Sequence, residues 1–404
     1  MSRIQRAAAG AVAFVALALM AAPALAGPEC HGGQSFDAWR QSFARRAVSA
    51  GVSPQVASEV MSGVRFDPGI VQRDRGQGVF AQSFLQFSDR MVAGYRLSKG
   101  AQELRRYAAV FSRVEQRWGV PGAVVTALWG LESDFGANIG NFPTLTALAT
   151  LAYDCRRPEL FETQLVAAMK IVQRGDLTPG EMHGAWAGEL GQTQFLPSDY
   201  VLHAVDFDGD GKRDLLHSVP DVLASTAADL AGFGWRRGQP WLQEVRVPPN
   251  LPWQQADLAI RHPRSYWVRL GVEARSGRLP ADGLPAALLL PMGRGGPAFL
   301  AYPNFDVFTQ WNKSLVYATT AAYFATRLEG APAVLRGDGG AGGLSVAQTR
   351  ELQAALARRG VAVGKIDGVL GEQTRAAVRQ LQIKYGMPAD GYPTPALLAR
   401  VRGG

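Results

Sequence analysis

The sequence predicts a mainly helical α+β protein. A large helical domain carries a small β-containing lobe, and a small helical domain follows it along the chain. Three observations lead to this fold class. Capped helical segments fill residues 36–118, short β-prone runs are confined to residues 245–300, and a Gly/Ala/Pro-rich stretch at residues 331–343 precedes a compact final unit. With 47% hydrophobic and 19% charged residues, the 404-residue chain has the composition of a folded globular protein.

The first 26 residues have the pattern of an export signal. Arg3 and Arg6 supply the positive start, residues 11–20 supply an apolar core, and residues 24–26 (Ala-Leu-Ala) form a small-residue cleavage site. The apolar run is too short to favour a permanent membrane span. We therefore expect residues 1–26 to be a signal peptide and the mature protein to be exported, periplasmic and soluble.

Cysteine usage and charge narrow the range of partners. Cys30 and Cys155 both follow the expected signal peptide, so a disulfide between them and two free thiols are both open. The net charge of +8 is spread along the chain without blocks of Lys or Arg. The absence of basic blocks argues against a nucleic-acid partner. The net positive charge suits an acidic polymer or an anionic surface as partner.

Turn and cap signals divide the first domain into successive helices. Residues 51–54 (Gly-Val-Ser-Pro) and 67–69 (Asp-Pro-Gly) each end one helix and begin another. A further helix begins at Pro121, which suits a first helical position, and Gly136 is a reasonable terminator. Helical patterning continues at residues 147–151, 160–173, 222–232 and 314–328.

The later part of the chain contains the β lobe, a linker and the final unit. Strands are expected at residues 244–247, 266–270 and 286–290, between proline and glycine turns. Residues 331–343 have the composition of a flexible linker. The unit after it contains a Leu-Gln pair twice and an Asp-Gly turn twice, without a catalytic pairing, so we expect a binding domain. A purely structural cap is the alternative.

One carboxylate is notable for its position in the apolar helix that begins at Pro121. Glu132 follows Leu128 by four residues, so a helix places both on the inward face. Burial raises the pKa of a carboxyl group and suits it to donate a proton near neutral pH. The alternative is a buried glutamate that accepts a hydrogen bond from an arginine or a tryptophan. Asp134 would point away from Glu132 and is no obvious second carboxylate.

Residues 206–217 are typical of a twelve-residue calcium loop. The ligand positions one, three, five, seven and nine are occupied by Asp206, Asp208, Asp210, Lys212 (through its carbonyl) and Asp214. His217 replaces the bidentate acid at position twelve. A structural calcium ion and a metal-free Asp-Gly turn are therefore both open.

Four motifs occur in order along the first domain: residues 129–136 (Trp-Gly-Leu-Glu-Ser-Asp-Phe-Gly), 186–198 (Trp-Ala-Gly-Glu-Leu-Gly-Gln-Thr-Gln-Phe-Leu-Pro-Ser), 206–211 (Asp-Phe-Asp-Gly-Asp-Gly), and 311–314 (Trp-Asn-Lys-Ser) with Tyr317. Over roughly residues 36–328 they resemble the membrane-bound lytic transglycosylase B family of bacterial cell-wall enzymes. The final unit resembles peptidoglycan-binding modules. The sequence departs from the family pattern at Ala185, where the family usually has Ser, and at Glu189, where it usually has Ala.

The resemblance implies a lysozyme-like domain at residues 27–330, a linker at 331–343 and a peptidoglycan-binding domain at 344–404. It implies non-hydrolytic cleavage of the β-1,4 bond between N-acetylmuramic acid and N-acetylglucosamine in peptidoglycan strands, with 1,6-anhydromuramoyl products and no required cofactor. Glu132 would be both acid and base, and the N-acetyl group of the substrate would replace a second carboxylate. The substrate-binding residues implied are Ser133, Gln194, Trp311, Asn312 and Tyr317.

Two other functions remain open at this point. A hydrolytic muramidase on the same fold would let water attack in place of the muramoyl hydroxyl, and a peptidoglycan-binding scaffold would not turn over at all. Zinc hydrolysis and nucleotide binding find little support, because the five histidines form no close ligand pair and no phosphate-binding fingerprint occurs.

Overall fold

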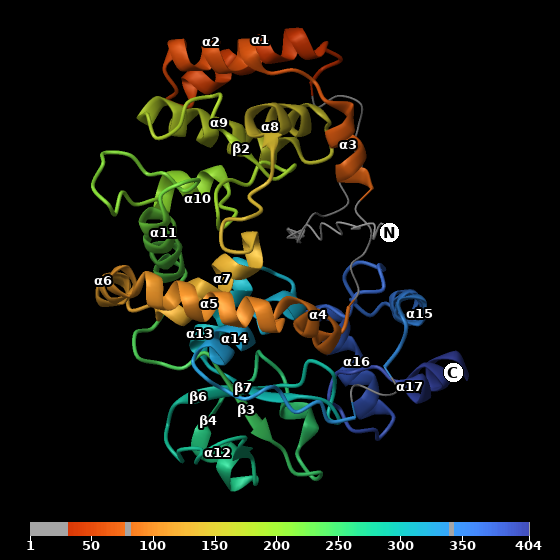
Figure 1. Ribbon diagram of the computed structural model, residues 1–404. Coiled ribbons are helices and arrows are strands. Elements are labelled where there is room, and N and C mark those ends of the chain that lie inside the picture. Colours follow the sequence, from red (N-terminus) through yellow and green to blue (C-terminus); the bar gives the residue numbers. More distant parts are fainter. Residues whose placement is uncertain (1–30, 77–81, 339–342, 404) are drawn as a thin grey trace, which may run out of the picture.

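The structure, a computed structural model, describes residues 31–76, 82–338 and 343–403 (Figure 1). The expected signal peptide and Cys30 lie outside these residues. The predicted fold class is confirmed: helices dominate the large domain, one small sheet forms a lobe, and a helical domain follows. Among the described residues, no helix is both long enough and apolar enough to cross a membrane.

The described residues between 36 and 118 form six helices, where the sequence predicts successive capped helices without fixing their number. They are α1 (Phe36–Ser49), α2 (Pro54–Gly63), α3 (Pro68–Arg75), α4 (Phe84–Met91), α5 (Gly94–Arg106) and α6 (Ala108–Trp118). Ser53 caps α2 by accepting a bond from the backbone N–H of Val56, and Asp67 caps α3 by accepting one from Gly69. A proline follows each cap at the first helical position.

A buried helix, α7 (Gly122–Ser133), runs through the centre of the large domain. All twelve of its residues are buried, and it packs against α5, α6, α11 (Val219–Gly232) and α14 (Leu315–Leu328). The expected single inward face is therefore wrong, because this helix has no solvent face. It also ends three residues before Gly136, since Asp134 and Phe135 adopt left-handed backbone angles (φ 55° and 61°).

The remaining helices of the large domain surround this centre. They are α8 (Thr144–Tyr153), α9 (Pro158–Arg174), α10 (Pro197–His203) and α13 (Pro303–Trp311). α8 and α9 pack against each other above α7, together with the two-stranded sheet of β1 (Phe142–Pro143) and β2 (His183–Gly184) (Figure 1). The segment between β2 and α10 therefore lies between the upper helices and α7.

The β lobe is an antiparallel sheet of five strands in the order β4-β6-β7-β3-β5. The strands are β3 (Leu242–Arg246), β4 (His262–Pro263), β5 (Glu273–Ala274), β6 (Pro285–Leu289) and β7 (Ala298–Ala301). A short 3-10 helix, Trp253–Gln255, lies between β3 and β4 in the chain. The strand expected at residues 266–270 is wrong, because this segment forms α12 (Arg264–Arg269). The helix buries Trp267 and directs its indole N–H to the carbonyl of Ala286, so packing overrides the β-propensity of the run.

Residues 331–338, the described beginning of the expected linker, lie against the large domain. The backbone N–H of Leu335 donates to Glu244 over 2.6 Å, and Arg336 forms an ion pair with Asp89 at 2.9 Å. This part of the segment is therefore held in place, although its composition is typical of a flexible linker.

The C-terminal domain contains α15 (Val346–Arg358), α16 (Glu372–Lys384) and α17 (Pro395–Gly403) around its own apolar core. The structure explains why a Leu-Gln pair and an Asp-Gly turn each occur twice in this domain. The side-chain oxygen of Gln353 accepts the backbone N–H of Gly368 over 2.7 Å, and that of Gln382 accepts the N–H of Gly391 over 2.9 Å. Each Leu-Gln pair thus fixes one Asp-Gly turn.

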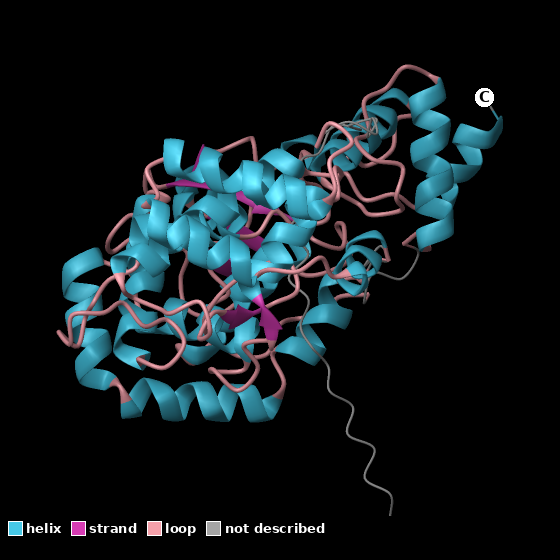
Figure 2. Ribbon diagram, turned by 90° about the horizontal axis from the view of Figure 1, so that it is seen from above, coloured by secondary structure: helices cyan, strands magenta, loops and turns pink. Residues whose placement is uncertain are grey.

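The C-terminal domain is docked on the β lobe and lies at one end of the molecule (Figure 2). Arg379 of α16 forms an ion pair with Asp257 and also donates to the carbonyl of Ala256. The backbone N–H of Arg294 donates to Asp390 over 3.0 Å. These contacts connect the two domains through polar groups of both.

Candidate active site

Glu132 lies at the C-terminal end of α7 with only 4% of its surface exposed. Its Oε1 atom accepts two hydrogen bonds, from the indole N–H of Trp311 over 2.9 Å and from the hydroxyl of Tyr317. Its Oε2 atom is buried and has no hydrogen-bond partner among the described residues. One oxygen is thus held by the protein, and the other is left for a proton or a ligand.

The environment of Glu132 favours the protonated carboxyl. Burial raises the pKa of Glu132 to about 7, and the nearby charge of Glu189 contributes in the same direction. The hydrogen bonds from Trp311 and Tyr317 act in the opposite direction, because they stabilise the carboxylate. A carboxyl with a pKa near neutrality can both donate and recover a proton.

Two later helices supply the partners of Glu132. Trp311 ends α13, and Tyr317 lies in the first turn of α14 behind the N-cap Ser314. The ring of Trp311 packs edge-on against Phe195, with 5.9 Å between centroids. The polar ends of Trp311 and Tyr317 thus point at Glu132. The sequence left a tryptophan bond to Glu132 open without naming the tryptophan, and it assigned Trp311 and Tyr317 to substrate binding.

The segment between β2 and α10 covers the end of α7. Gln192 accepts the indole N–H of Trp129 over 2.8 Å and donates to the carbonyl of Leu216 over 2.9 Å. Its amide also lies where a side chain at Gly136 would stand, so Gly136 permits this close approach. Sequence reasoning gave Gln192 no role, and its place in the motif at residues 186–198 was the only available signal.

Replacing Gln192 with leucine should destabilise the protein by about 2–4 kcal/mol, because it leaves the Trp129 N–H and the Leu216 carbonyl buried without partners. Chemical denaturation measures this loss. Gln55→Leu in α2 is the control, since the side chain of Gln55 is exposed. Equal stability of Gln192→Leu and the parent would show that the bonds of Gln192 to Trp129 and Leu216 do not stabilise the fold.

The other expected site residues, Gln194, Ser133 and Asn312, form hydrogen bonds with backbone groups near Glu132 and Tyr317. Gln194 is partly buried, and its amide nitrogen donates to the carbonyls of Ile139 and Gly191 over 3.1 and 2.8 Å. Ser133 is buried, and its hydroxyl accepts the N–H of Gly136 over 2.8 Å. Asn312 is also buried and accepts the N–H of Ser314 over 2.9 Å. Ser133 and Asn312 therefore shape the backbone around Glu132 and Tyr317.

Backbone strain gathers around this site. Among the described non-glycine residues, Asp134, Phe135 and Gln194 have positive φ, and Cys155 is the fourth. Asp134 turns away from Glu132 and forms an ion pair with Arg96 at 3.2 Å, as expected of a residue that is no second carboxylate. Such conformations persist where the surrounding structure enforces them.

The expected calcium loop is only partly assembled. Carboxylate oxygens of Asp206, Asp208 and Asp210 lie within 4.8 Å of one another. Asp214 is not in this group, because its Oδ1 accepts the N–H of Leu216 and its Oδ2 lies 3.0 Å from the His217 ring. Three of the expected side-chain ligands thus fit a cation, and the fourth does not.

Cys155 is disulfide-bonded. The expected pairing with Cys30 stays a prediction, because Cys30 lies outside the described residues.

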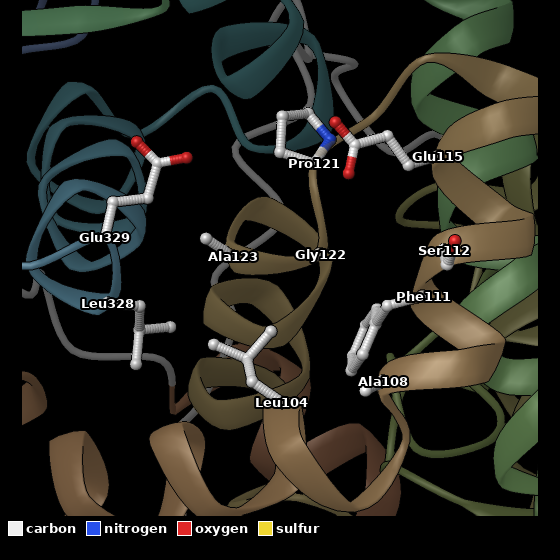
Figure 3. A pocket seen from close by; sticks show the side chains of 10 residues that line it. All are labelled: Leu104, Ala108, Phe111, Ser112, Glu115, Pro121, Gly122, Ala123, Leu328 and Glu329. Carbon is white, nitrogen blue, oxygen red and sulfur yellow. The ribbon is translucent and has the colours of Figure 1, made fainter.

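A pocket of about 490 Å³ opens elsewhere on the large domain, between α5, α6, α7 and α14 (Figure 3). Gly122 and Ala123 line it at the beginning of α7, and Glu115 and Glu329 stand at its rim. Glu132 lies ten residues further along α7, a separation of about 15 Å on a helix. The pocket therefore does not include the carboxyl with the strongest case for chemistry.

Comparison with known proteins places both domains. Residues 35–326 match the family described as transglycosylase SLT domain, and residues 345–401 match a peptidoglycan binding domain family. Membrane-bound lytic murein transglycosylase B of Escherichia coli (strain K12) is 30% identical over 244 residues, which are 58% of this chain and 64% of that protein. The match thus spans just under two thirds of that relative.

Solved structures extend the similarity to both domains. The crystal structure of SltB3 from Pseudomonas aeruginosa in complex with NAG-anhNAM-pentapeptide is 42% identical, covers 92% of this chain and 100% of that chain, and superposes with a TM-score of 0.84. The Escherichia coli lytic transglycosylase Slt35 in complex with calcium is 26% identical, covers 72% of this chain and 92% of that chain, and has a TM-score of 0.61.

Proposed function

Because the chain belongs to the transglycosylase SLT domain family, we propose that it is a lytic transglycosylase that cleaves peptidoglycan between N-acetylmuramic acid and N-acetylglucosamine. One observation carries this proposal: Glu132 is buried, held through one oxygen by Trp311 and Tyr317, and unpartnered at the other. A titratable group of this kind at a motif shared with the family is the expected acid of a glycosidic cleavage.

The reaction needs only one protein carboxyl. Protonated Glu132 gives its proton to the leaving oxygen of N-acetylglucosamine, while the N-acetyl oxygen of the muramoyl residue attacks the anomeric carbon. The muramoyl C6 hydroxyl then attacks the same carbon, displaces the N-acetyl oxygen and returns its proton to Glu132. Bond breaking and bond making balance without water, and the product carries a 1,6-anhydro ring.

The surrounding residues support each step. Trp311 and Tyr317 orient the carboxyl and stabilise the charge that Glu132 carries after the first transfer. Gln194 uses its amide nitrogen within the protein, which leaves the amide oxygen as the acceptor that it can offer a sugar. The C-terminal domain, docked on the β lobe, binds the polymer and keeps the enzyme on it.

The mature protein acts outside the cytoplasm under this proposal. The export pattern of residues 1–26 supports a periplasmic location, where the proposed substrate would lie. A structure of a relative that contains NAG-anhNAM-pentapeptide supports the same substrate class for this chain.

Mass spectrometry of the muropeptides released from purified sacculi tests the reaction type. We expect products with anhydromuramoyl ends. A product one water heavier, with a reducing end, would instead establish the hydrolytic muramidase. Release of no muropeptide at all, with binding to sacculi retained, would leave only a binding scaffold.

Catalysis requires no cofactor in this proposal, and a calcium ion would have a structural role. Asp206, Asp208 and Asp210 would hold it, and Lys212 would offer its carbonyl, while the carboxylate of Asp214 is occupied by His217. A structure of the similar Slt35 in complex with calcium supports calcium as the cation to test. Because the bidentate acid is missing, the affinity should be low.

His217→Glu should convert this weak site into a stronger one. We expect millimolar calcium to raise the melting temperature of the parent by about 1 °C or less and that of His217→Glu by several degrees, because stabilisation grows with the ratio of ligand to Kd. Adding Asp208→Asn to His217→Glu should remove the gain. An equal response of the parent and His217→Glu would count against a cation at these three aspartates.

A further inference from the structure

The C-terminal domain contains two Asp-Gly turns of the same construction. Residues 390–392 (Asp-Gly-Tyr), here called the docked turn, contact the β lobe, and residues 367–369 (Asp-Gly-Val) are called the open turn. In each turn the Oδ1 atom of the aspartate accepts the backbone N–H two residues later, over 3.0 Å from Tyr392 and over 2.8 Å from Val369. The two turns are therefore equivalent parts of an internal repeat.

Two positions on the preceding helices correspond in the same way. Arg379 of α16 and Arg350 of α15 each stand three residues before the glutamine that fixes their turn. Arg375 and Val346 each stand seven residues before it, and their carbonyl oxygens lie 3.2 and 2.6 Å from where a Cβ on the glycine of each turn would stand. Val346 and Arg350 therefore occupy at the open turn the places that Arg375 and Arg379 occupy at the docked turn.

The docked turn and the helix before it hold a stretch of the β lobe through its peptide groups. The Oδ2 atom of Asp390 accepts the backbone N–H of Arg294 over 3.0 Å. Arg375 donates to two successive backbone carbonyls, that of Leu290 over 3.1 Å and that of Pro291. This half of the domain is therefore a surface that binds a peptide backbone, and the β lobe is its occupant.

The equivalent surface at the open turn is exposed. Asp367 uses Oδ1 within the turn, and no described residue donates to its Oδ2 atom. Ile366 is 47% exposed, and Val346 and Val369 are each 36% exposed. Arg350 is exposed as well and donates to the carbonyl of Asp367 over 3.1 Å. These five residues, called the open surface, combine a free carboxylate oxygen, a cation and apolar side chains, a combination that suits a partner molecule.

We propose that the open surface binds the peptide stems of peptidoglycan: the Oδ2 atom of Asp367 accepts a backbone N–H of the stem, and the exposed apolar side chains contact its side chains. Residues 344–404 carry nine Lys and Arg residues against four Asp and Glu residues, so the domain complements the carboxylates of such stems. The inference rests on the proposed function, because it takes peptidoglycan to be the polymer that this domain binds.

The chemistry of the open surface favours the peptide part of the polymer over the glycan part. A peptide stem offers N–H donors, carboxylates and apolar side chains, which match Asp367, Arg350 and the exposed aliphatic residues. The open surface contains no aromatic ring, hydroxyl or amide side chain, so the many hydroxyl groups of a glycan would find few partners there. The docked turn, which is built in the same way, also holds a peptide.

The repeat then divides two tasks between its halves. The docked turn and the ion pair of Arg379 with Asp257 fix the domain to the β lobe. The open turn is left to hold the substrate. Because both sites belong to one molecule, a stem bound at the open surface raises the effective concentration of its strand at the large domain.

Fluorescence anisotropy of a labelled, glycan-free peptide stem, titrated with the full-length protein, tests the inference. We expect the parent to bind the stem and Asp367→Asn to bind it about three- to tenfold more weakly, because an amide nitrogen in place of Oδ2 cannot accept an N–H. The amide oxygen of this variant can still accept the N–H of Val369, so the turn is kept. Ile366→Ser removes apolar contact alone and should weaken binding by a similar factor.

Ile383→Ser is the matched control for Ile366→Ser. Ile383 is 51% exposed in the same domain, but it lies in α16 and is not part of the open surface. This variant should bind the stem as the parent does. Thermal melting of each variant confirms that it is folded.

Absence of stem binding by the parent would overturn the inference, as would the affinity of the parent in either Asp367→Asn or Ile366→Ser. Peptide-free glycan strands serve as the second probe. If Asp367→Asn weakened the binding of these strands and not that of the stem, the open surface would recognise sugar and the inference would fail. All these measurements are independent of turnover, whereas failure of the proposed function is seen when the parent releases no anhydromuropeptides.

Discussion

Replacing Glu132 with glutamine should lower the rate of anhydromuropeptide release by about 10²–10⁴-fold. Glutamine cannot donate a proton to the leaving oxygen and cannot recover one from the C6 hydroxyl. Its amide oxygen can still accept the bonds from Trp311 and Tyr317, so the site keeps its shape. Product quantification from intact sacculi by mass spectrometry measures the loss.

The same change should stabilise the fold near and above neutral pH. Burial raises the pKa of Glu132 from 4.5 to about 7, so the folded state binds a proton that the unfolded state releases between these pH values. The parent therefore loses stability as pH rises through this interval, by an amount on the order of 2–3 kcal/mol. Glu132→Gln has no such loss and should melt at a higher temperature than the parent at pH 7.5.

Glu103→Gln is the matched control, because Glu103 is also buried but lies in α5 and does not contact Trp311 or Tyr317. It should keep the activity of the parent. Binding of Glu132→Gln to sacculi should be unchanged, which separates turnover from attachment. If Glu132→Gln released anhydromuropeptides at the rate of the parent, neither the acid nor the base role of Glu132 would stand.

Removing the hydroxyl of Tyr317 should lower kcat by roughly tenfold, because the carboxylate formed after proton donation loses a hydrogen bond. The same bond lowers the pKa of Glu132, so Tyr317→Phe should move the alkaline limb of activity to higher pH. The pH dependence of kcat/KM measures both effects.

Tyr323→Phe is the control on the same helix, since the Tyr323 hydroxyl accepts the N–H of Val334 and lies outside the site. It should leave kcat and the alkaline limb unchanged. A Tyr317→Phe variant with the rate and the limb of the parent would show that the hydroxyl only fills space.

Much of the fold and one central site residue follow from local sequence patterns. Ser53 and Asp67 begin their helices through bonds to residues two or three positions away, so their caps are visible in the sequence. The Leu-Gln and Asp-Gly repeats of the last domain are similarly local. Glu132 stands out because its motif and the apolar residues before it lie together in one helix.

Other expectations failed where distant parts of the chain decide the outcome. Residues 266–270 are rich in residues with high β-propensity, yet Trp267 packs on the sheet from α12. The composition of residues 331–338 predicts flexibility, but bonds to Glu244 and Asp89 hold the segment. Neither partner is near in sequence, so no local pattern could indicate it.

The sequence by itself identified the carboxyl that we propose for the reaction, because a motif needs only neighbouring residues. Tertiary structure alone decided how that carboxyl behaves. The Trp311 and Tyr317 donors lie 179 and 185 residues from Glu132, and Glu189 comes from a separate segment. A pKa depends on burial and on charges in space, and folding brings these together from positions that sequence spacing does not relate.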